Sequence, residues 1–210
     1  MKKISELQCL LSVVYVAALM IANVVEAKQS AFFGGAMTCG NLVFPITYIL
    51  SDVFSEVYGY RFSRKTCIWA FAMNILMVCV FQIAIATPAP GYWENQQAFA
   101  TVLGSTPRIV AASTLAFLFG DFVNDIIFQK MKERSANSKS FGARAIISSV
   151  FGELADSLVF FPIAFIGEMP AKTLAVMAMV QVLMKVGYEI AMLPITRSVV
   201  KKVSAHEARA

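Results

Sequence analysis

Histidine and charge are scarce in this chain of 210 residues: there is one histidine, and only 15% of the residues are charged. Ordinary soluble domains carry about 25% charged residues. Because His206 lies in a polar tail, no histidine can bind zinc or act as a base within the apolar segments. The GxGD pattern of intramembrane aspartyl proteases is also missing around Asp121. These absences exclude the common intramembrane proteases and indicate a protein that is not an enzyme.

Paired cysteines and long polar segments are missing as well. The four cysteines form no CxxC pair, so they are interpreted as small buried hydrophobes, with neither a disulfide framework nor a metal site. No cofactor is expected. No loop is long enough to fold separately, so residues 1–210 are predicted to form a single membrane domain.

Apolar segments make up most of the chain. The sequence is 58% hydrophobic and its mean hydropathy is +0.68, values typical of a polytopic membrane protein. The predicted fold is all-α, a bundle of six transmembrane helices that uses most of the length. The expected spans cover about residues 4–25, 31–58, 66–87, 108–131, 145–166 and 173–199.

The basic residues are distributed very unevenly over the predicted loops. Two lie at the N-terminus, three after the second span, five after the fourth and four at the C-terminus, which gives fourteen on one side. Only three lie on the other side. This bias predicts that both termini are cytoplasmic. It also explains the net charge of +5 without direct binding of nucleic acid.

The sequence FPITYILSDVFSEVYGYRFSRK, residues 44–65, combines an apolar helix, two acids and a basic turn. Asp52 and Glu56 are four residues apart, so on a helix they share one face with Tyr48 and Asn41. A charge among lipid tails costs about 3 kcal/mol, so such residues normally face a cavity or a partner. The alternative is that both acids only cap the helix end and pair with the basic residues that follow.

Polar residues also mark three later spans at overlapping depth, as a solute cavity between helices requires. Seven acids lie within the spans beside one base, Lys185, so they cannot all stay charged away from water. Lys185 and Glu189 are equally well explained as a structural ion pair one turn apart. Pro45 and Pro162 predict that the second and fifth helices are broken. The further candidate site residues are Asp121, Asn124, Asp125, Glu153, Asp156, Gln181, Lys185 and Glu189.

The motif at residues 44–65 and the later SSVFGELADSLVFF closely resemble the bacterial queuosine precursor transporters, a family once described as vitamin uptake proteins. The likeness covers about residues 31–196. It implies import of 7-cyano-7-deazaguanine, and of its 7-aminomethyl relative, across the bacterial inner membrane. It assigns no individual substrate contacts.

The candidate residues suit a deazaguanine. A carboxylate such as Asp52 can accept its two adjacent N–H groups, and Tyr48, Phe117, Phe160 or Tyr188 can stack on its ring. Its carbonyl needs a donor, for which Asn41, Asn124, Gln181 or Lys185 would serve. The sequence leaves open the energy source and whether one protomer or a homodimer forms the pathway. The alternative function is the substrate-binding subunit of a vitamin importer that needs a separate ATP-driven module.

Overall fold

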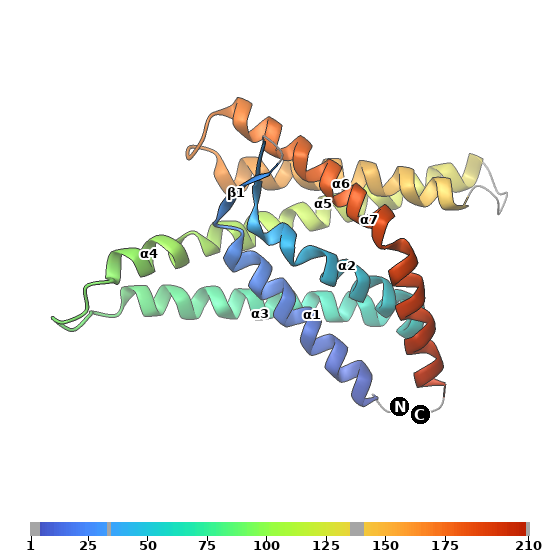
Figure 1. Cartoon of the computed structure of the whole chain (residues 1–210), viewed down its shortest axis with the longest axis horizontal. Helices are drawn as coiled ribbons and strands as arrows, with labels where there is room; N and C mark the ends of the chain where they lie inside the picture. Colours follow the sequence, from blue (N-terminus) through green and yellow to red (C-terminus); the bar gives the residue numbers. More distant parts are fainter. Residues whose placement is uncertain (1–4, 33–34, 135–140, 209–210) are drawn as a thin grey trace. The chain divides into compact units, whose positions relative to one another are not determined.

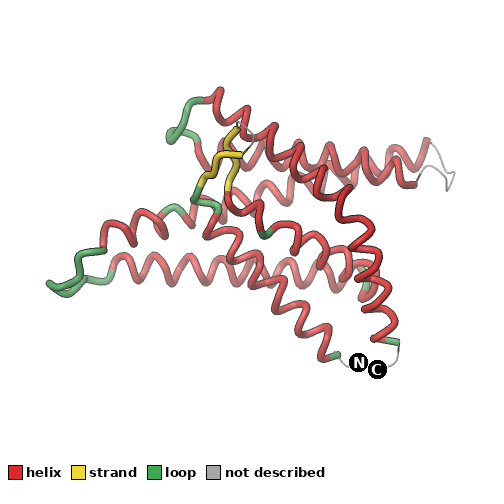
Figure 2. The backbone as a smooth tube through the Cα atoms, in the orientation of Figure 1, coloured by secondary structure: helices red, strands yellow, loops and turns green. Residues whose placement is uncertain are grey.

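The computed structural model describes residues 5–32, 35–134 and 141–208, and nearly all of them are helical (Figures 1 and 2). The fold is therefore the predicted all-α polytopic membrane bundle. Within the described residues, five helices are long and apolar enough to cross a membrane. The number of six spans and the side on which the termini lie stay predictions. The five candidate spans are Glu6–Val25, Arg61–Ala86, Gln96–Asn124, Ile146–Phe165 and Ala171–Glu207.

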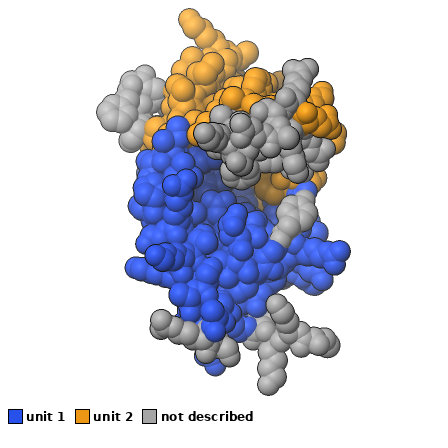
Figure 3. All heavy atoms as spheres, turned by 90° about the vertical axis from the view of Figure 1, so that its right-hand side faces the viewer, with its two compact units in different colours: residues 1–28, 38–107, 188–210 blue, residues 29–37, 108–187 orange. Residues whose placement is uncertain are grey.

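The chain divides into two compact units (Figure 3). Unit 1 comprises Met1–Lys28, Thr38–Pro107 and Tyr188–Ala210, and unit 2 comprises Gln29–Met37 and Arg108–Gly187. The long helix α7, Ala171–Glu207, contributes to both units. The single membrane domain expected from the sequence stays a prediction.

Unit 1 is built on α1 (Glu6–Val25), α2 (Phe44–Val53) and α3 (Tyr60–Ala86), with the short α4 (Gln96–Gly104). Its core contains Tyr15, Leu50, Phe54 and Ala70, and the rings of Tyr15 and Phe54 meet edge to face at 5.5 Å. Such ring pairs add about 0.5–1.5 kcal/mol beyond the area that they bury. The short α2 is therefore held by packing rather than by its own length.

Three hydrogen bonds between side chains join the elements of unit 1. Buried Asn23 on α1 donates its side-chain amide to Asn74 on α3 at 2.9 Å. At the chain ends, the Ser5 hydroxyl donates to the Glu207 carboxylate at 2.6 Å, and the Tyr58 hydroxyl donates to the same oxygen at 2.9 Å. The beginning of α1 and the end of α7 are thus hydrogen-bonded to each other.

Unit 2 contains α5 (Thr106–Arg134), α6 (Phe141–Phe165) and the first part of α7, with the hairpin of β1 (Gln29–Phe32) and β2 (Gly35–Thr38). Glycines bring α5 and α6 into backbone contact. A Cβ on Gly120 would lie 2.9 Å from the Gly152 carbonyl oxygen, and one on Gly152 would lie 3.0 Å from that of Gly120. Small residues at such crossings let membrane helices pack closely.

The second predicted span, residues 31–58, is not a continuous helix. Its first part forms the β1–β2 hairpin and a 3-10 turn, η1 (Cys39–Leu42), and α2 starts only at Phe44. Glycines weaken a helix before Pro45, and Pro45 itself is favoured in the first turn, where its missing N–H costs nothing. The break predicted at Pro45 is confirmed, but the helix expected before it was wrong.

The break expected at Pro162 does not occur, because α6 runs through Pro162 to Phe165. The helix ends less than one turn later, before Gly167 with φ of 87°. Arg108 then donates to the carbonyl oxygens of Ile163 and Ile166, each at 2.6 Å. These bonds satisfy carbonyls that a helix end leaves without partners.

Candidate functional site

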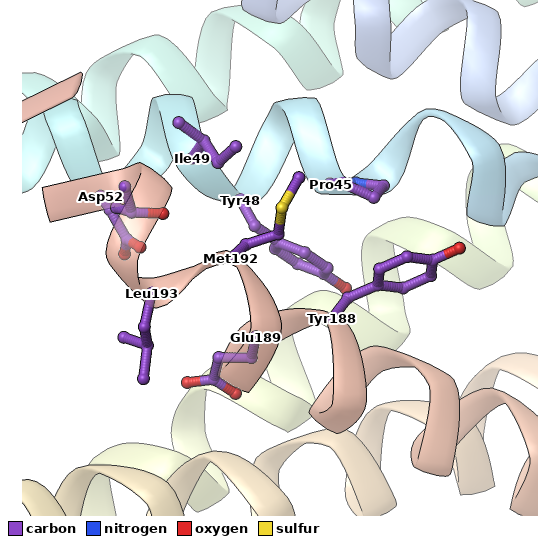
Figure 4. A pocket seen from close by; sticks show the side chains of 9 residues that line it. Pro45, Tyr48, Ile49, Asp52, Tyr188, Glu189, Met192 and Leu193 are labelled. Carbon is purple, nitrogen blue, oxygen red and sulfur yellow. The ribbon is translucent and has the colours of Figure 1, made fainter. Parts of the chain in front are cut away.

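A pocket lies between α2 and the C-terminal part of α7, wholly within unit 1 (Figure 4). It brings together three of the candidates named from the sequence, Tyr48, Asp52 and Glu189. Among its other lining residues, Tyr188 was named from the sequence only as one possible ring for stacking. Thr196 was not named as a candidate. The full lining is Pro45, Tyr48, Ile49, Asp52, Tyr188, Glu189, Met192, Leu193 and Thr196.

Helical spacing explains why these residues share the pocket. On α2 they are Pro45, Tyr48, Ile49 and Asp52, a spacing of three, four and seven residues that forms one stripe. The other face of α2 is anchored, since Thr47, Leu50 and Val53 are buried. The α7 residues repeat in the same way between positions 188 and 196. Burial of one stripe therefore turns the other toward α7, as Figure 4 shows.

The chemistry of the pocket combines two carboxylates, two phenol rings and one hydroxyl. No lysine or arginine is among the nine described lining residues. Carboxylates accept hydrogen bonds, whereas the hydroxyls of Tyr48, Tyr188 and Thr196 can donate or accept them. The pocket can therefore receive a planar molecule that carries N–H donors, with rings available for stacking.

The pocket is small, about 50 Å³. That volume holds a few water molecules, whereas enclosed sites for drug-sized ligands measure roughly 300–1,000 Å³. In the described conformation it can accept one edge of a small ring. Full enclosure of a bicyclic base requires α2 and the C-terminal part of α7 to move apart.

Glu56 is not among the described residues that line this pocket with Asp52, and the shared face predicted for the pair stays a prediction. The residues from Phe54 to Tyr58 form a π-helix, η2, whose bonds skip five residues instead of four. Glu56 lies within this π-helix and is not among the described lining residues of the pocket. π-Helical turns are frequent at functional sites, and this one directly follows the Asp52 stripe.

A second charged cluster lies in unit 2. The Lys185 ammonium is 2.8 Å from a Glu153 oxygen and 2.7 Å from an Asp156 oxygen. The exposed fraction of the lysine side chain is only 6%, and that of each acid is 20%. Lys185 is thus engaged with α6, while the pairing proposed with Glu189 stays a prediction.

The remaining candidates are distributed over other places. Asn41 is buried in η1 and donates to the Thr38 carbonyl at 3.3 Å. Asp121 is half-buried on α5, and Asn124 lies on the same helix where it meets Gly152. The side chain of Asp125 lies outside the described residues. Gln181 is buried on α7, one turn before Lys185.

Sequence reasoning missed one buried acid, Glu26, which was assigned to a short link. Its side chain is 1% exposed, and it accepts a hydrogen bond of 2.6 Å from the Thr38 hydroxyl. Gly40 is required beside it, because a Cβ there would overlap the Glu26 carboxylate. No spacing rule could find this contact, since its partners lie 12 and 14 residues further along a non-helical segment.

Comparison with known proteins identifies the family of this chain. A family model described as "Putative vitamin uptake transporter" matches residues 38–199. No solved structure matches the chain.

Three relatives carry a transporter name. The "Probable queuosine precursor transporter" of Bacillus subtilis (strain 168) is 26% identical over 154 residues, which cover 73% of this chain and 67% of the relative. The "Queuosine precursor transporter" of Escherichia coli (strain K12) is 23% identical over 74% of this chain and 67% of the relative. A "Probable queuosine precursor transporter" of Haemophilus influenzae (strain ATCC 51907 / DSM 11121 / KW20 / Rd) is 25% identical over 61% of this chain and 52% of the relative.

The matched region spans both motifs and extends from the 3-10 turn before α2 to α7, so it includes the pocket and the Lys185 cluster. It covers well over half of the chain. The chain is therefore a multi-pass membrane protein that belongs to this transporter family, the family of the queuosine precursor transporters.

Proposed function

We propose that this protein imports a queuosine precursor, 7-cyano-7-deazaguanine or its 7-aminomethyl relative, across the bacterial inner membrane. The names of the relatives support the substrate class. The observation that carries the proposal is the pocket in which Asp52 and Glu189 lie with Tyr48 and Tyr188.

The acids suit the polar edge of a guanine-like ring. That edge presents a ring N–H beside an amino group, and one carboxylate can accept both in parallel. Asp52 belongs to the stripe of α2 that lines the pocket and is our choice for this contact. Adenine presents an acceptor where guanine has N1–H, so a lone pair would face the carboxylate. Such an unpaired contact costs roughly 1–3 kcal/mol.

The rest of the pocket suits the ring and its carbonyl. Tyr48 and Tyr188 provide flat surfaces for stacking, which is worth about 1–3 kcal/mol per base. A hydroxyl of Tyr188 or Thr196 can donate to the carbonyl. These donors replace the amide and lysine donors considered from the sequence, because Lys185 is engaged with Glu153 and Asp156.

The proposal also covers the membrane, the orientation of the chain and its oligomeric state. In this proposal six helices cross the lipid bilayer. The basic residues, fourteen on one side and three on the other, favour cytoplasmic termini. The pathway is formed by one protomer or by a homodimer, and no contact with nucleic acid is required.

Uptake by the purified full chain in proteoliposomes tests the function. Labelled 7-cyano-7-deazaguanine should enter vesicles that contain only this protein, and unlabelled guanine-like compounds should compete better than adenine. Entry without an ATP-driven module would exclude the alternative of a substrate-binding subunit. Vesicles that neither take up nor exchange the labelled compound would overturn the proposal.

A further inference from the structure

We propose that Glu153, Asp156 and Lys185 form a proton-binding site that couples import to the proton gradient. The coupling rests on the proposed function, whereas proton binding by these three residues does not. The three residues are called the Lys185 triad below.

The triad consists of two acids and one base held in direct contact. Both acid contacts to the Lys185 ammonium are shorter than 3 Å, and they come from one face of α6, three residues apart. Because the ammonium has three donors, it can hold both carboxylates at once. With all three groups ionised, the triad carries one net negative charge.

That net charge is the reason to expect a proton. An uncompensated charge within a membrane bundle costs several kcal/mol, whereas a neutral cluster avoids most of this cost. One proton on a carboxylate leaves one acid and one base, which compensate each other. A proton shared by the pair of acids belongs to the triad as a whole rather than to either residue.

Two further buried polar groups lie on the helices that carry or pack against the triad acids. Ser157, next to Asp156, is 1% exposed, and its hydroxyl oxygen has no hydrogen-bond partner among the described residues. The Asn124 side-chain oxygen on α5 is also buried without a partner in this part of the chain. An Asn124 oxygen can accept from a protonated carboxyl, which an ionised carboxylate cannot offer. Helices α5 and α6 thus each carry a buried hydrogen-bonding group without a partner among the described residues.

Two other acids, Asp121 and Asp125, lie on α5, the helix that packs against α6. Asp121 on α5 follows Gly120, whose Cβ position lies 3.0 Å from the Cβ of Asp156. Asp125 is on the same helix, and its side chain lies outside the described residues.

The coupling step is a proton transfer without any other bond change. A proton from external water forms an O–H bond with a carboxylate oxygen of Glu153 or Asp156, and the contact of that carboxyl with the Lys185 ammonium changes from an ion pair to a charge–dipole contact. Release to cytoplasmic water restores the ion pair. Import proceeds when substrate binding favours the protonated triad.

Proton binding can be tested without substrate by infrared difference spectroscopy of the full chain in nanodiscs, between alkaline and acidic buffer. The wild type should gain the carbonyl band of a buried protonated carboxyl, and Glu153→Gln and Asp156→Asn should each lose it. Glu133→Gln, an exposed acid on α5, is the control that should keep the band. A spectrum in which neither triad variant removes a band would overturn the site.

Coupling can be tested in proteoliposomes with labelled 7-cyano-7-deazaguanine. An inward proton gradient should make the wild type accumulate the compound above its external concentration. In Glu153→Gln and Asp156→Asn, accumulation should fall to equilibrium while exchange across the membrane persists. Accumulation by both variants as in the wild type, or accumulation driven by sodium instead of protons, would refute the coupling. Absence of exchange in the wild type would instead refute the proposed function, and the infrared test would still decide proton binding.

Discussion

Acidic side chains occur in two different settings in this protein. In the α2–α7 pocket of unit 1, Asp52 and Glu189 share the lining with aromatic rings and hydroxyls, and no basic residue is among the described lining residues. In unit 2, Glu153 and Asp156 are held by Lys185. Residues of the same type therefore take different tasks according to the groups that face them. Acids in the pocket can accept from a ligand, whereas acids of the triad already have an internal donor.

The largest expected effect tests the triad. Lys185→Met leaves two half-buried acids without their base, so the free energy of unfolding should fall by about 3–5 kcal/mol. Thermal unfolding in detergent measures it. Lys172→Met is the matched control, because Lys172 lies on the same helix and is exposed, and it should unfold like the wild type. If Lys185→Met and Lys172→Met unfold at the same temperature, Lys185 does not stabilise the two acids, and the acids of unit 2 do not differ from those of the pocket in this respect.

The next effect tests the pocket. Asp52→Asn keeps the shape but replaces a charged double acceptor with an amide, so the half-saturation concentration for uptake should rise roughly 10- to 100-fold without a loss of stability. Glu56→Gln is the control, since Glu56 is exposed and does not line the pocket. If Asp52→Asn transports normally at wild-type expression, the substrate binds elsewhere.

A third effect concerns the helix contact that supports the triad. Gly120→Ala places a methyl group 2.9 Å from the Gly152 carbonyl oxygen, so the helices must separate, at a cost of about 1–3 kcal/mol. Gly187→Ala is the control, because nothing lies within 4 Å of its Cβ position. Thermal unfolding should distinguish the two variants, and equal melting temperatures would show that α5 and α6 tolerate separation.

The smallest effect separates stacking from hydrogen bonding in the pocket. Tyr48→Leu removes a ring and should raise the half-saturation concentration roughly five- to tenfold. Tyr48→Phe keeps the ring, which also stacks on Phe44 at 6.2 Å, and should change it less. Uptake kinetics of the two variants provide the comparison. A larger defect in Tyr48→Phe would assign the role to the hydroxyl instead.

Local periodicity in the sequence predicted much of this structure. The stripe through Tyr48 and Asp52 was predicted because helical spacing is a property of neighbouring residues. The break at Pro45 was predicted because the missing N–H and fixed φ of proline act locally. The all-α bundle followed in the same way from the lengths of the apolar segments.

Contacts between distant segments could not be predicted. Whether Lys185 pairs with an acid on its own helix or with α6 depends on how α6 and α7 pack, which the sequence of α7 does not contain. The Glu26 contact with Thr38 depends on a hairpin that replaces an expected helix. The π-helical turn at Phe54–Tyr58 also has no periodic signal in the sequence.

The hydrogen bond between Ser5 and Glu207 has a consequence for how often the chain crosses the membrane. From this contact we predict that Ser5 and Glu207 lie at the same membrane surface, which would need an even number of crossings. Five described helices are long enough to cross, which is an odd number. Parity therefore favours the segment from β2 to η2 as a further crossing, with irregular backbone that is tolerated at that depth when protein buries it. Reporters fused to the two termini should then report the same compartment.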